Sequence, residues 1–393
     1  MLGLVLEGGG AKGAFHIGAL KALFENSYKF DAVMGASIGA FNGAVVAQGD
    51  FDICYDLWNN LTPSMLADVD DEKYTNIVHK RWDKDTVKYL FGILRRTIAN
   101  RGLPTDKMRA FFSQYINEEK LRASSMDFGI VTVSMTDDWL PIEIFKDQMP
   151  PGTILDYIFA SASFPAFKKE EIAGKRYMDG GIYDNLPLNP LIRKGYQNII
   201  AIRTMSNMPR QKVIDMSVKI DYICPSEPLG KTLSFTQERL RRNLKMGYFD
   251  ALRFIKNYAG VLYYLEPMSD AEFTNYVNVS GILPFKKVST LFDLPVREDA
   301  SDTISALSKK LKDLGIVATS SFNTFLSFLE PFAQALGVDR FEVYTAEHFL
   351  KKLLEKYIIT GREVLDEKIK LKPELKNLFH VIVNTIITHG DLI

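Results

Sequence analysis

The sequence predicts an α/β protein, with a doubly wound, mainly parallel sheet and helices on both of its faces, followed by a mainly helical C-terminal domain. The short apolar run Leu2–Leu6 leads into a glycine cluster, after which apolar residues recur at helical spacing. The same strand–turn–helix pattern returns at 31–34 and 38–48. Two such units within fifty residues indicate a parallel sheet covered by helices.

The rest of the chain extends this pattern. Residues 50–125 read as mostly helical with loops, whereas 129–135 and 198–203 are β-branched strands and 219–224 is another. From about residue 235 onward the pattern is mainly helical, with apolar residues three and four apart in 341–359 and 375–387. We therefore expect a first domain over 1–255 and a mainly helical domain of unassigned role over 256–393.

Composition and charge exclude several classes of protein. The 393 residues are 47% hydrophobic and 24% charged, which is ordinary for a globular chain. Lys and Arg total 48, as do Asp and Glu, so no basic excess points to nucleic acid as a partner. The two cysteines indicate neither a disulfide framework nor a metal site, and a reduced compartment fits best.

The chain is expected to be cytoplasmic, without a signal peptide or a transmembrane helix. Its N-terminus lacks the basic region and long apolar core of a signal peptide. Residues 32–49 carry no charge and reach the length of a membrane span. However, several glycines and polar residues interrupt them, so we interpret this stretch as a buried strand, a tight turn and a buried helix.

The glycine cluster 8–13 (Gly-Gly-Gly-Ala-Lys-Gly) fits two templates. The spacing of Gly8, Gly10 and Gly13 matches a dinucleotide fingerprint, but the second strand does not end in the acid that would hold a ribose. Ala14 excludes a Walker A loop. Alternatively, the cluster is an oxyanion hole, with backbone N–H groups converging at a helix N-terminus and Lys12 nearby. A tight turn without chemistry also stays open.

Gly35-Ala36-Ser37-Ile38-Gly39 has the form of a nucleophile elbow. Such an elbow needs small flanking residues because it places the serine on a sharp strand-to-helix turn. A Ser-His-Asp triad is not favoured, because none of the five histidines follows a recognisable strand, and His16 lies on a helix. A carboxylate can instead activate the serine. The best candidate is Asp179 of Asp179-Gly180-Gly181, with Asp184 as the local competitor.

These three motifs, in this order, resemble the patatin-like phospholipase family, and in particular its bacterial members. That family combines a glycine-rich oxyanion loop, a G-x-S-x-G elbow and a D-G-[G/A] acid. Residues 160–167 are similar to the loop that precedes the acid in the family, and Gly247-Tyr248 with Asp250-Ala251 is similar to the end of the bacterial core. The resemblance covers roughly residues 2–255, and the rest of the chain resembles no family that we can name.

The resemblance implies a serine esterase or lipid acyl hydrolase, of the phospholipase A or lysophospholipase kind, with a Ser-Asp dyad and an acyl-enzyme intermediate. Ser37 would be the nucleophile and Asp179 the general base, and the N–H groups of Gly9, Gly10 and Ala11 would stabilise the oxyanion. No metal or other cofactor is implied, and the substrate would be a lipid or phospholipid acyl ester. The implied site comprises the catalytic residues Ser37 and Asp179, the oxyanion loop Gly8, Gly9, Gly10, Ala11, Lys12 and Gly13, and the supporting glycines Gly35, Gly39, Gly180 and Gly181.

Other functions stay open at this point. The same dyad could serve an acyltransferase, and a binding or scaffolding protein could use an inactive hydrolase fold. Residues 81–109 carry eight basic and three acidic side chains around an apolar stripe, including Leu90 and Phe91. We favour a cap helix packed on the core, with peripheral membrane contact as the alternative. Arg239, Arg241, Arg242 and Lys245 are expected to form a solvated helix face. The oligomeric state is open.

Overall fold

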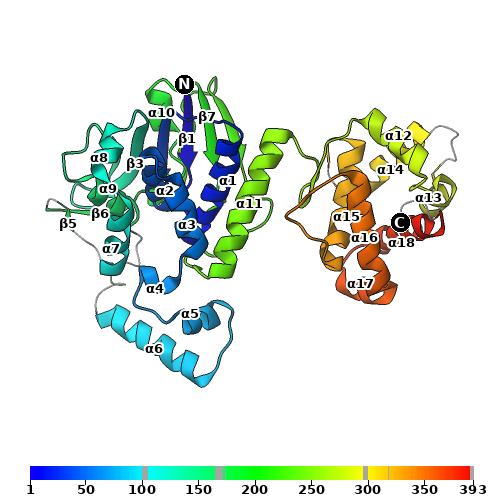
Figure 1. Cartoon of the computed structure of the whole chain (residues 1–393), viewed down its shortest axis with the longest axis horizontal. Helices are drawn as coiled ribbons and strands as arrows, with labels where there is room; N and C mark the ends of the chain where they lie inside the picture. Colours follow the sequence, from blue (N-terminus) through cyan, green and yellow to red (C-terminus); the bar gives the residue numbers. More distant parts are fainter. Residues whose placement is uncertain (100–104, 164–170, 173, 295–299, 317, 390–393) are drawn as a thin grey trace. The chain divides into compact units, whose positions relative to one another are not determined.

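The computed structural model describes residues 1–99, 105–163, 171–172, 174–294, 300–316 and 318–389. The chain divides into two compact units, 1–252 and 253–393. Figure 1 shows the first unit in blue to green, built around a sheet, and the second in yellow to red, built mainly of helices. Each unit is described by itself below.

The first unit contains an eight-stranded, mainly parallel sheet, as predicted. Its order is β5-β6-β3-β2-β1-β7-β8, and β4 pairs with β3 off this path. The strands β3, β2, β1, β7 and β8 run parallel, whereas β4 and β6 pair antiparallel with β3, and β5 pairs antiparallel with β6. The strands are β1 (Leu2–Leu6), β2 (Ala32–Ala36), β3 (Asp127–Ser134), β4 (Leu140–Phe145), β5 (Glu171–Ile172), β6 (Lys175–Asp179), β7 (Asn198–Ile202) and β8 (Lys219–Ile223).

Helices cover both faces of this sheet, which confirms the predicted fold class. The glycine loop ends in the short η1 (Gly10–Gly13), which leads into α1 (Ala14–Glu25). On one face, α2 (Ile38–Ala47) packs against Val33 of β2. On the other, Leu191 of α10 (Asn189–Arg193) packs beside β1. The long helix α11 (Gln237–Lys256) lies beside α1 (Figure 1).

Residues 50–125 are mostly helical, as predicted. In Figure 1, α5 and α6 form a pair next to α4, on the side of the sheet where α7 also lies. This segment forms one wall of the candidate active site. Its helices are α3 (Phe51–Asn60), α4 (Pro63–Leu66), α5 (Asp71–Val78), α6 (Lys84–Ala99), α7 (Asp106–Tyr115) and α8 (Glu118–Ala123), and α9 (Ile154–Ser161) and η2 (Gly180–Ile182) follow.

The second unit is mainly helical, in agreement with the sequence pattern. Its core is rich in phenylalanine, and the rings of Phe332 and Phe379 stack with their centroids 4.0 Å apart. A short parallel pair, β9 (Tyr264–Leu265) and β10 (Val343–Tyr344), accompanies the helices. These helices are α12 (Asp270–Ser280), α13 (Phe285–Phe292), α14 (Ala300–Asp313), α15 (Ser321–Leu336), α16 (Ala346–Thr360), α17 (Arg362–Lys368) and α18 (Pro373–His389).

The uncharged stretch 32–49 adopts the predicted strand, turn and helix. Residues 32–36 form β2 and residues 38–47 form α2, and both elements are buried. Throughout the part of the chain that the structure describes, no helix is both long enough and apolar enough to cross a membrane.

Candidate active site

Ser37 occupies the sharp turn between β2 and α2. Its backbone has φ 54° and ψ −125°, a left-handed conformation that is uncommon for a residue with a side chain. Two flanking glycines make the turn possible. A Cβ at position 35 would lie 2.3 Å from the carbonyl carbon of Gly39, and a Cβ at position 39 would lie 2.3 Å from the carbonyl oxygen of Leu6. The serine is therefore held at the N-terminus of a buried helix, in the geometry expected of an elbow.

The α9 helix fixes the backbone of this turn. The Ser37 N–H donates to the Oγ of Ser161, the last residue of α9, at 3.0 Å. Ser161 is fully buried. The elbow is thus tied to a helix far away in the sequence, through a residue of the stretch 160–167 that resembles the loop before the acid.

Asp179 ends β6 and lies close to Ser37. The carboxyl group is only 3% exposed, and its Oδ1 accepts the Gly181 N–H at 2.8 Å. Burial raises the pKa of Asp179 to about 6, against the lowering effect of hydrogen bonds from the Ser37 side chain and the Gly181 amide. The structure therefore brings together the predicted serine and the predicted acid.

The acid loop is held tightly around this carboxylate. The backbone N–H of Asp179 donates to the Ser163 carbonyl at 3.0 Å. Gly180 packs directly on β3, since a Cβ there would lie 2.0 Å from the Val131 carbonyl oxygen. The position of the carboxylate is consequently set by β3 on one side and by the segment after α9 on the other.

Two N–H groups of the glycine loop face the cavity without an internal partner. Gly9 and Gly10 line the cavity, and among the described residues neither of their N–H groups has a hydrogen-bond acceptor. The expectation for Ala11 needs correction, because its N–H donates to the Thr232 carbonyl at 2.8 Å. The Gly8 N–H is also engaged, with the Asn185 carbonyl at 3.0 Å. The available donors are therefore Gly9 and Gly10.

The loop is anchored to neighbouring segments at both ends. Gly8 accepts hydrogen bonds at its carbonyl from Asn185 Nδ2 (3.2 Å) and Thr204 Oγ1 (2.6 Å). At the other end, the Gly13 carbonyl accepts from Asn42 Nδ2 at 3.1 Å, which links the loop to α2. Sequence motifs did not indicate Asn185, Thr204 or Thr232, because each reaches the loop only through the fold.

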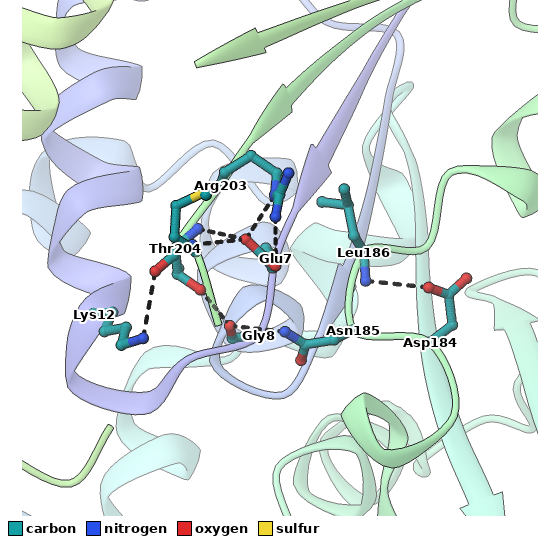
Figure 2. Close-up of polar contacts among 9 residues, drawn as sticks. Glu7, Gly8, Lys12, Asp184, Asn185, Leu186, Arg203 and Thr204 are labelled. Atoms are coloured by element: carbon teal, nitrogen blue, oxygen red, sulfur yellow. Dashed lines mark hydrogen bonds and ion pairs between the residues drawn. The ribbon is translucent and has the colours of Figure 1, made fainter. Parts of the chain in front are cut away.

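A buried ion pair lies next to the loop (Figure 2). The carboxylate of Glu7 is fully buried and pairs with Arg203, with Oε2 2.9 Å from Nε. The same oxygen accepts the backbone N–H groups of Thr204 (2.6 Å) and Met205 (3.0 Å). Since Thr204 also holds Gly8, this arrangement connects the end of β7 to the first glycine of the loop.

Lys12 lines the cavity next to these donors. Its Nζ donates to the Thr204 carbonyl at 3.4 Å (Figure 2). Burial lowers the pKa of Lys12, and the charge of Glu7 partly opposes this effect. An incoming negative group would gain a nearby cation here.

The competing candidates lie away from this chemistry. His16 is fully buried on α1 beside Asn42, and burial lowers its pKa to about 3, so its ring is neutral. Asp184 is also buried, and its Oδ1 accepts the N–H of Leu186 at 3.2 Å (Figure 2). The same oxygen accepts the N–H of Gln211 at 3.2 Å. Neither side chain lines the cavity that holds Ser37 and Asp179.

The cavity has a volume of about 830 Å³ and a largely apolar wall. Its polar floor includes Ser37, Asp179 and the glycine loop. Leu90 and Ile93 of α6 face this cavity, whereas Phe91 of the same helix is 67% exposed. Arg101 and residues 164–167 of the predicted acid-preceding loop lie outside the described residues. The apolar lining includes Ile38, Pro63, Leu66, Val69, Ile77, Met108, Phe112, Ala162, Met208, Leu233 and Phe235.

No metal centre accompanies the site within the described residues. None of their His, Cys, Asp and Glu side chains form a group of three or more that could hold a metal ion. The chemistry available at the cavity floor is that of a serine hydroxyl, a buried carboxylate, backbone donors and a lysine.

Comparisons with known proteins agree with the resemblance of the three motifs to the patatin-like family. Residues 4–192 match the family model described as patatin-like phospholipase. Neuropathy target esterase sws of Drosophila melanogaster is 28% identical over 214 residues, which is 51% of this chain and 13% of that protein. The Drosophila sechellia protein of the same name is 28% identical over 199 residues, or 47% of this chain and 11% of that protein. The chain thus spans a small part of the length of these curated relatives.

Two solved structures also align with this chain, at low TM-scores. VipD from Legionella pneumophila aligns with a TM-score of 0.41 and 17% identity, over 98% of this chain and 91% of that one. Full-length ExoU of Pseudomonas aeruginosa, solved in complex with SpcU, aligns with a TM-score of 0.28 and 14% identity, over 94% and 90% of the two chains.

The fold, the site and the family match are those expected of a domain of the esterase and phospholipase class. More narrowly, the chain carries a patatin-like phospholipase domain over residues 4–192, which confirms the family that the motifs resembled. Lipids are accordingly the class of substrate that the family implies.

Proposed function

We propose that this chain hydrolyses acyl esters of lipids through a Ser37–Asp179 dyad and an acyl-enzyme intermediate. The observation that carries the proposal is the position of Ser37, at a left-handed turn facing a buried carboxylate whose pKa is raised to about 6. A carboxylate with such a pKa is a stronger base than a free aspartate and is still ionised at neutral pH. The pKa of Asp179 thus suits a base that takes the proton of Ser37.

The apolar cavity supports a lipid as the acyl donor. Burying an acyl chain against the wall that includes Leu90, Ile93 and Phe112 contributes about 0.8 kcal/mol per methylene. The ester carbonyl would then lie at the polar floor, near Ser37. Because the wall lacks ionised groups over most of its surface, we expect long and medium acyl esters to be preferred over acetyl esters.

Each step can be assigned to groups at the floor. Ser37 Oγ attacks the ester carbonyl while Asp179 takes its proton, and the alcohol leaves with a proton returned by Asp179. Gly9 and Gly10 donate to the oxyanion, and the N-terminus of α2 adds a favourable dipole. Asp179 then takes a proton from water, which attacks the acyl-enzyme. The bond to Ser37 Oγ breaks, the fatty acid is released, and Asp179 returns the proton to Ser37.

Trapping the acyl-enzyme tests the proposal. Wild-type protein is mixed rapidly with a p-nitrophenyl decanoate, quenched in acid and mapped by mass spectrometry, with Ser37→Ala as the control. We expect a mass increase of one decanoyl group on the peptide that contains Ser37, and none in the variant. Nitrophenol release without an adduct at Ser37, or at an equal rate in the variant, would refute the dyad.

The acyl-enzyme trapped in this way also separates hydrolysis from acyl transfer. Adding glycerol to the acyl-enzyme yields an acyl glycerol only if the alcohol outcompetes water as the acceptor. We expect free decanoic acid as the main product. A dominant glyceride product would instead assign the dyad to an acyltransferase.

A further inference from the structure

A second chamber adjoins the cavity that holds Ser37 and Asp179. It has a volume of about 630 Å³ and is lined mainly by the segment after β8 and by the start of α11. Lys12, Gly230 and Lys231 line both spaces. The two chambers therefore lie next to each other and share these three lining residues.

Positive charge predominates in this second chamber. Lys12, Lys231 and Arg239 all line it. Among its described lining residues, the one acidic side chain is Glu227, which forms an ion pair with Arg242. Arg239 also differs from the expected solvated helix face, because its guanidinium lies over Gly230 and donates to the Leu229 carbonyl at 3.4 Å. The chamber consequently keeps a surplus of cations.

A buried hydroxyl group in the chamber has no partner. Ser234 is 2% exposed and lines the chamber, and its Oγ forms no hydrogen bond within the described residues. An unsatisfied buried polar group costs about 1–3 kcal/mol. A ligand oxygen in the chamber would accept from this hydroxyl and remove that cost, so the serine points to an occupant with acceptor atoms.

We propose that this chamber binds a phosphate group, held by Lys12, Lys231 and Arg239 and by the hydroxyl of Ser234. Phosphate matches these groups because it offers several acceptor oxygens and negative charge. The phosphate could belong to the head group of the lipid whose acyl ester lies at Ser37, in which case the proposal rests on the function proposed above. It could equally be free inorganic phosphate, and the experiments below distinguish the two sources.

Binding is measured first, without any need for catalysis. Titration calorimetry follows inorganic phosphate and glycerol 3-phosphate binding to the full chain carrying Ser37→Ala. Lys231→Met and Arg239→Gln are added to this background singly and together, and Ser234→Ala singly. We expect each lost cation to weaken binding about tenfold or more, since a hydrogen bond to a charged group is involved. Lys245→Met, an exposed change on α11, is the matched control and is expected to bind as the parent does.

Selectivity is measured next, with 1-oleoyl lysophosphatidic acid and 1-oleoylglycerol as substrates. These share an acyl chain and differ by the phosphate, so the ratio of their kcat/KM values reports the phosphate alone. If the head group is the source, we expect the wild type to favour lysophosphatidic acid. The double variant Lys231→Met/Arg239→Gln, made here with Ser37 intact, is expected to lose at least tenfold of that ratio. Phosphate binding that the double variant loses, with the ratio unchanged, assigns the site to free phosphate.

The proposal is overturned if the double variant and the wild type agree in both phosphate binding and substrate ratio. Failure of the dyad looks different. In that case neither lipid is hydrolysed and no adduct forms at Ser37, while phosphate binding and its loss in the variants can still be measured.

Discussion

The backbone N–H of Ser37 donates to the side-chain oxygen of Ser161 at 3.0 Å, so that the serine elbow is tied to the end of α9. The segment that follows α9 also holds the acid, because the Ser163 carbonyl accepts the N–H of Asp179 at 3.0 Å. A single stretch of chain therefore positions both members of the proposed dyad.

Replacing Ser161 by Ala should slow the acylation of Ser37. Losing the acceptor leaves the buried N–H of the elbow unpaired, at a cost of about 1–3 kcal/mol, which loosens the alignment of the serine. We expect kcat to fall roughly tenfold with a small change in KM, measured with a p-nitrophenyl ester. Ser163→Ala is the control, since among the described residues its hydroxyl bonds only to the Phe159 carbonyl. Equal effects of the two changes would contradict the role given to Ser161.

The rate of acylation should depend on the ionisation of Asp179. Because the base must be a carboxylate, the rate is expected to rise about tenfold per pH unit below pH 6 and to level off above it. The pH profile of kcat/KM for a neutral ester measures this. An inflection near the ordinary value of an aspartate, 3.8, would show that burial does not tune this group.

Asp179→Asn should stabilise the fold at neutral pH. The folded-state pKa is raised from 3.8 to about 6, so folding favours the protonated form. The stabilisation that this carboxyl group contributes is complete below the unfolded pKa and is lost as pH rises through about 6. The variant does not titrate here and should become more stable than the wild type by up to about 3 kcal/mol between pH 4 and pH 7.

Urea unfolding at several pH values tests this stability difference, with Asp221→Asn, at a half-buried position of β8, as the control. A variant that is less stable than the wild type at pH 7 would show that the carboxylate is held at no cost to folding. Greater stability together with lost activity is the expected trade-off at an active site.

Gly39→Ala should destabilise the first unit strongly. The new Cβ would lie 2.3 Å from the Leu6 carbonyl oxygen, and the backbone of β1 at the sheet centre cannot move aside. We expect a loss of about 1–3 kcal/mol or more of unfolding free energy. Gly43→Ala in the same helix is the control, because its Cβ would meet the Val33 side chain at 3.0 Å and alanine favours a helix. Similar losses in both variants would argue against the tight elbow.

Glu7→Gln should destabilise the fold around the glycine loop. Removing one member of a buried ion pair leaves Arg203 without its counter-charge, which typically costs about 3–5 kcal/mol. Glu171→Gln breaks the exposed pair with Arg176 instead and should cost less than about 1 kcal/mol. Thermal unfolding of the two variants gives the comparison. Should Glu7→Gln prove neutral, Glu7 would have no bracing role.

Much of the sheet could be predicted from the sequence, because buried parallel strands read as continuous apolar runs. The runs at β1, β2, β3, β7 and β8 were all predicted. The antiparallel strands β4 and β6 were missed. β4 mixes Pro141 and Glu143 with apolar residues and is mostly only half-buried, and β6 begins with exposed Lys175 and Arg176. Such partly exposed strands carry no strong apolar pattern.

The residues of the site that lie in local sequence motifs could be predicted. The residues that reach the site only through contacts between distant segments could not. Small residues around Ser37 and Asp179 leave a local signature, since their backbones must approach closely. The choice of loop donors could not be read in this way. The Ala11 N–H is occupied by Thr232, and Thr204 and Asn185 hold Gly8, through contacts between segments far apart in the chain.

Fluorophosphonate labelling tests the central claim most directly, because the reagent reports an activated serine whatever the lipid substrate is. Wild type, Ser37→Ala, Asp179→Ala and Asp184→Asn are compared by intact mass and peptide mapping, after circular dichroism confirms equal folding. We predict one adduct on Ser37 in the wild type and in Asp184→Asn, none on Ser37→Ala, and labelling slowed at least about 100-fold in Asp179→Ala. Labelling at another residue, or an undiminished rate without Asp179, would contradict the dyad.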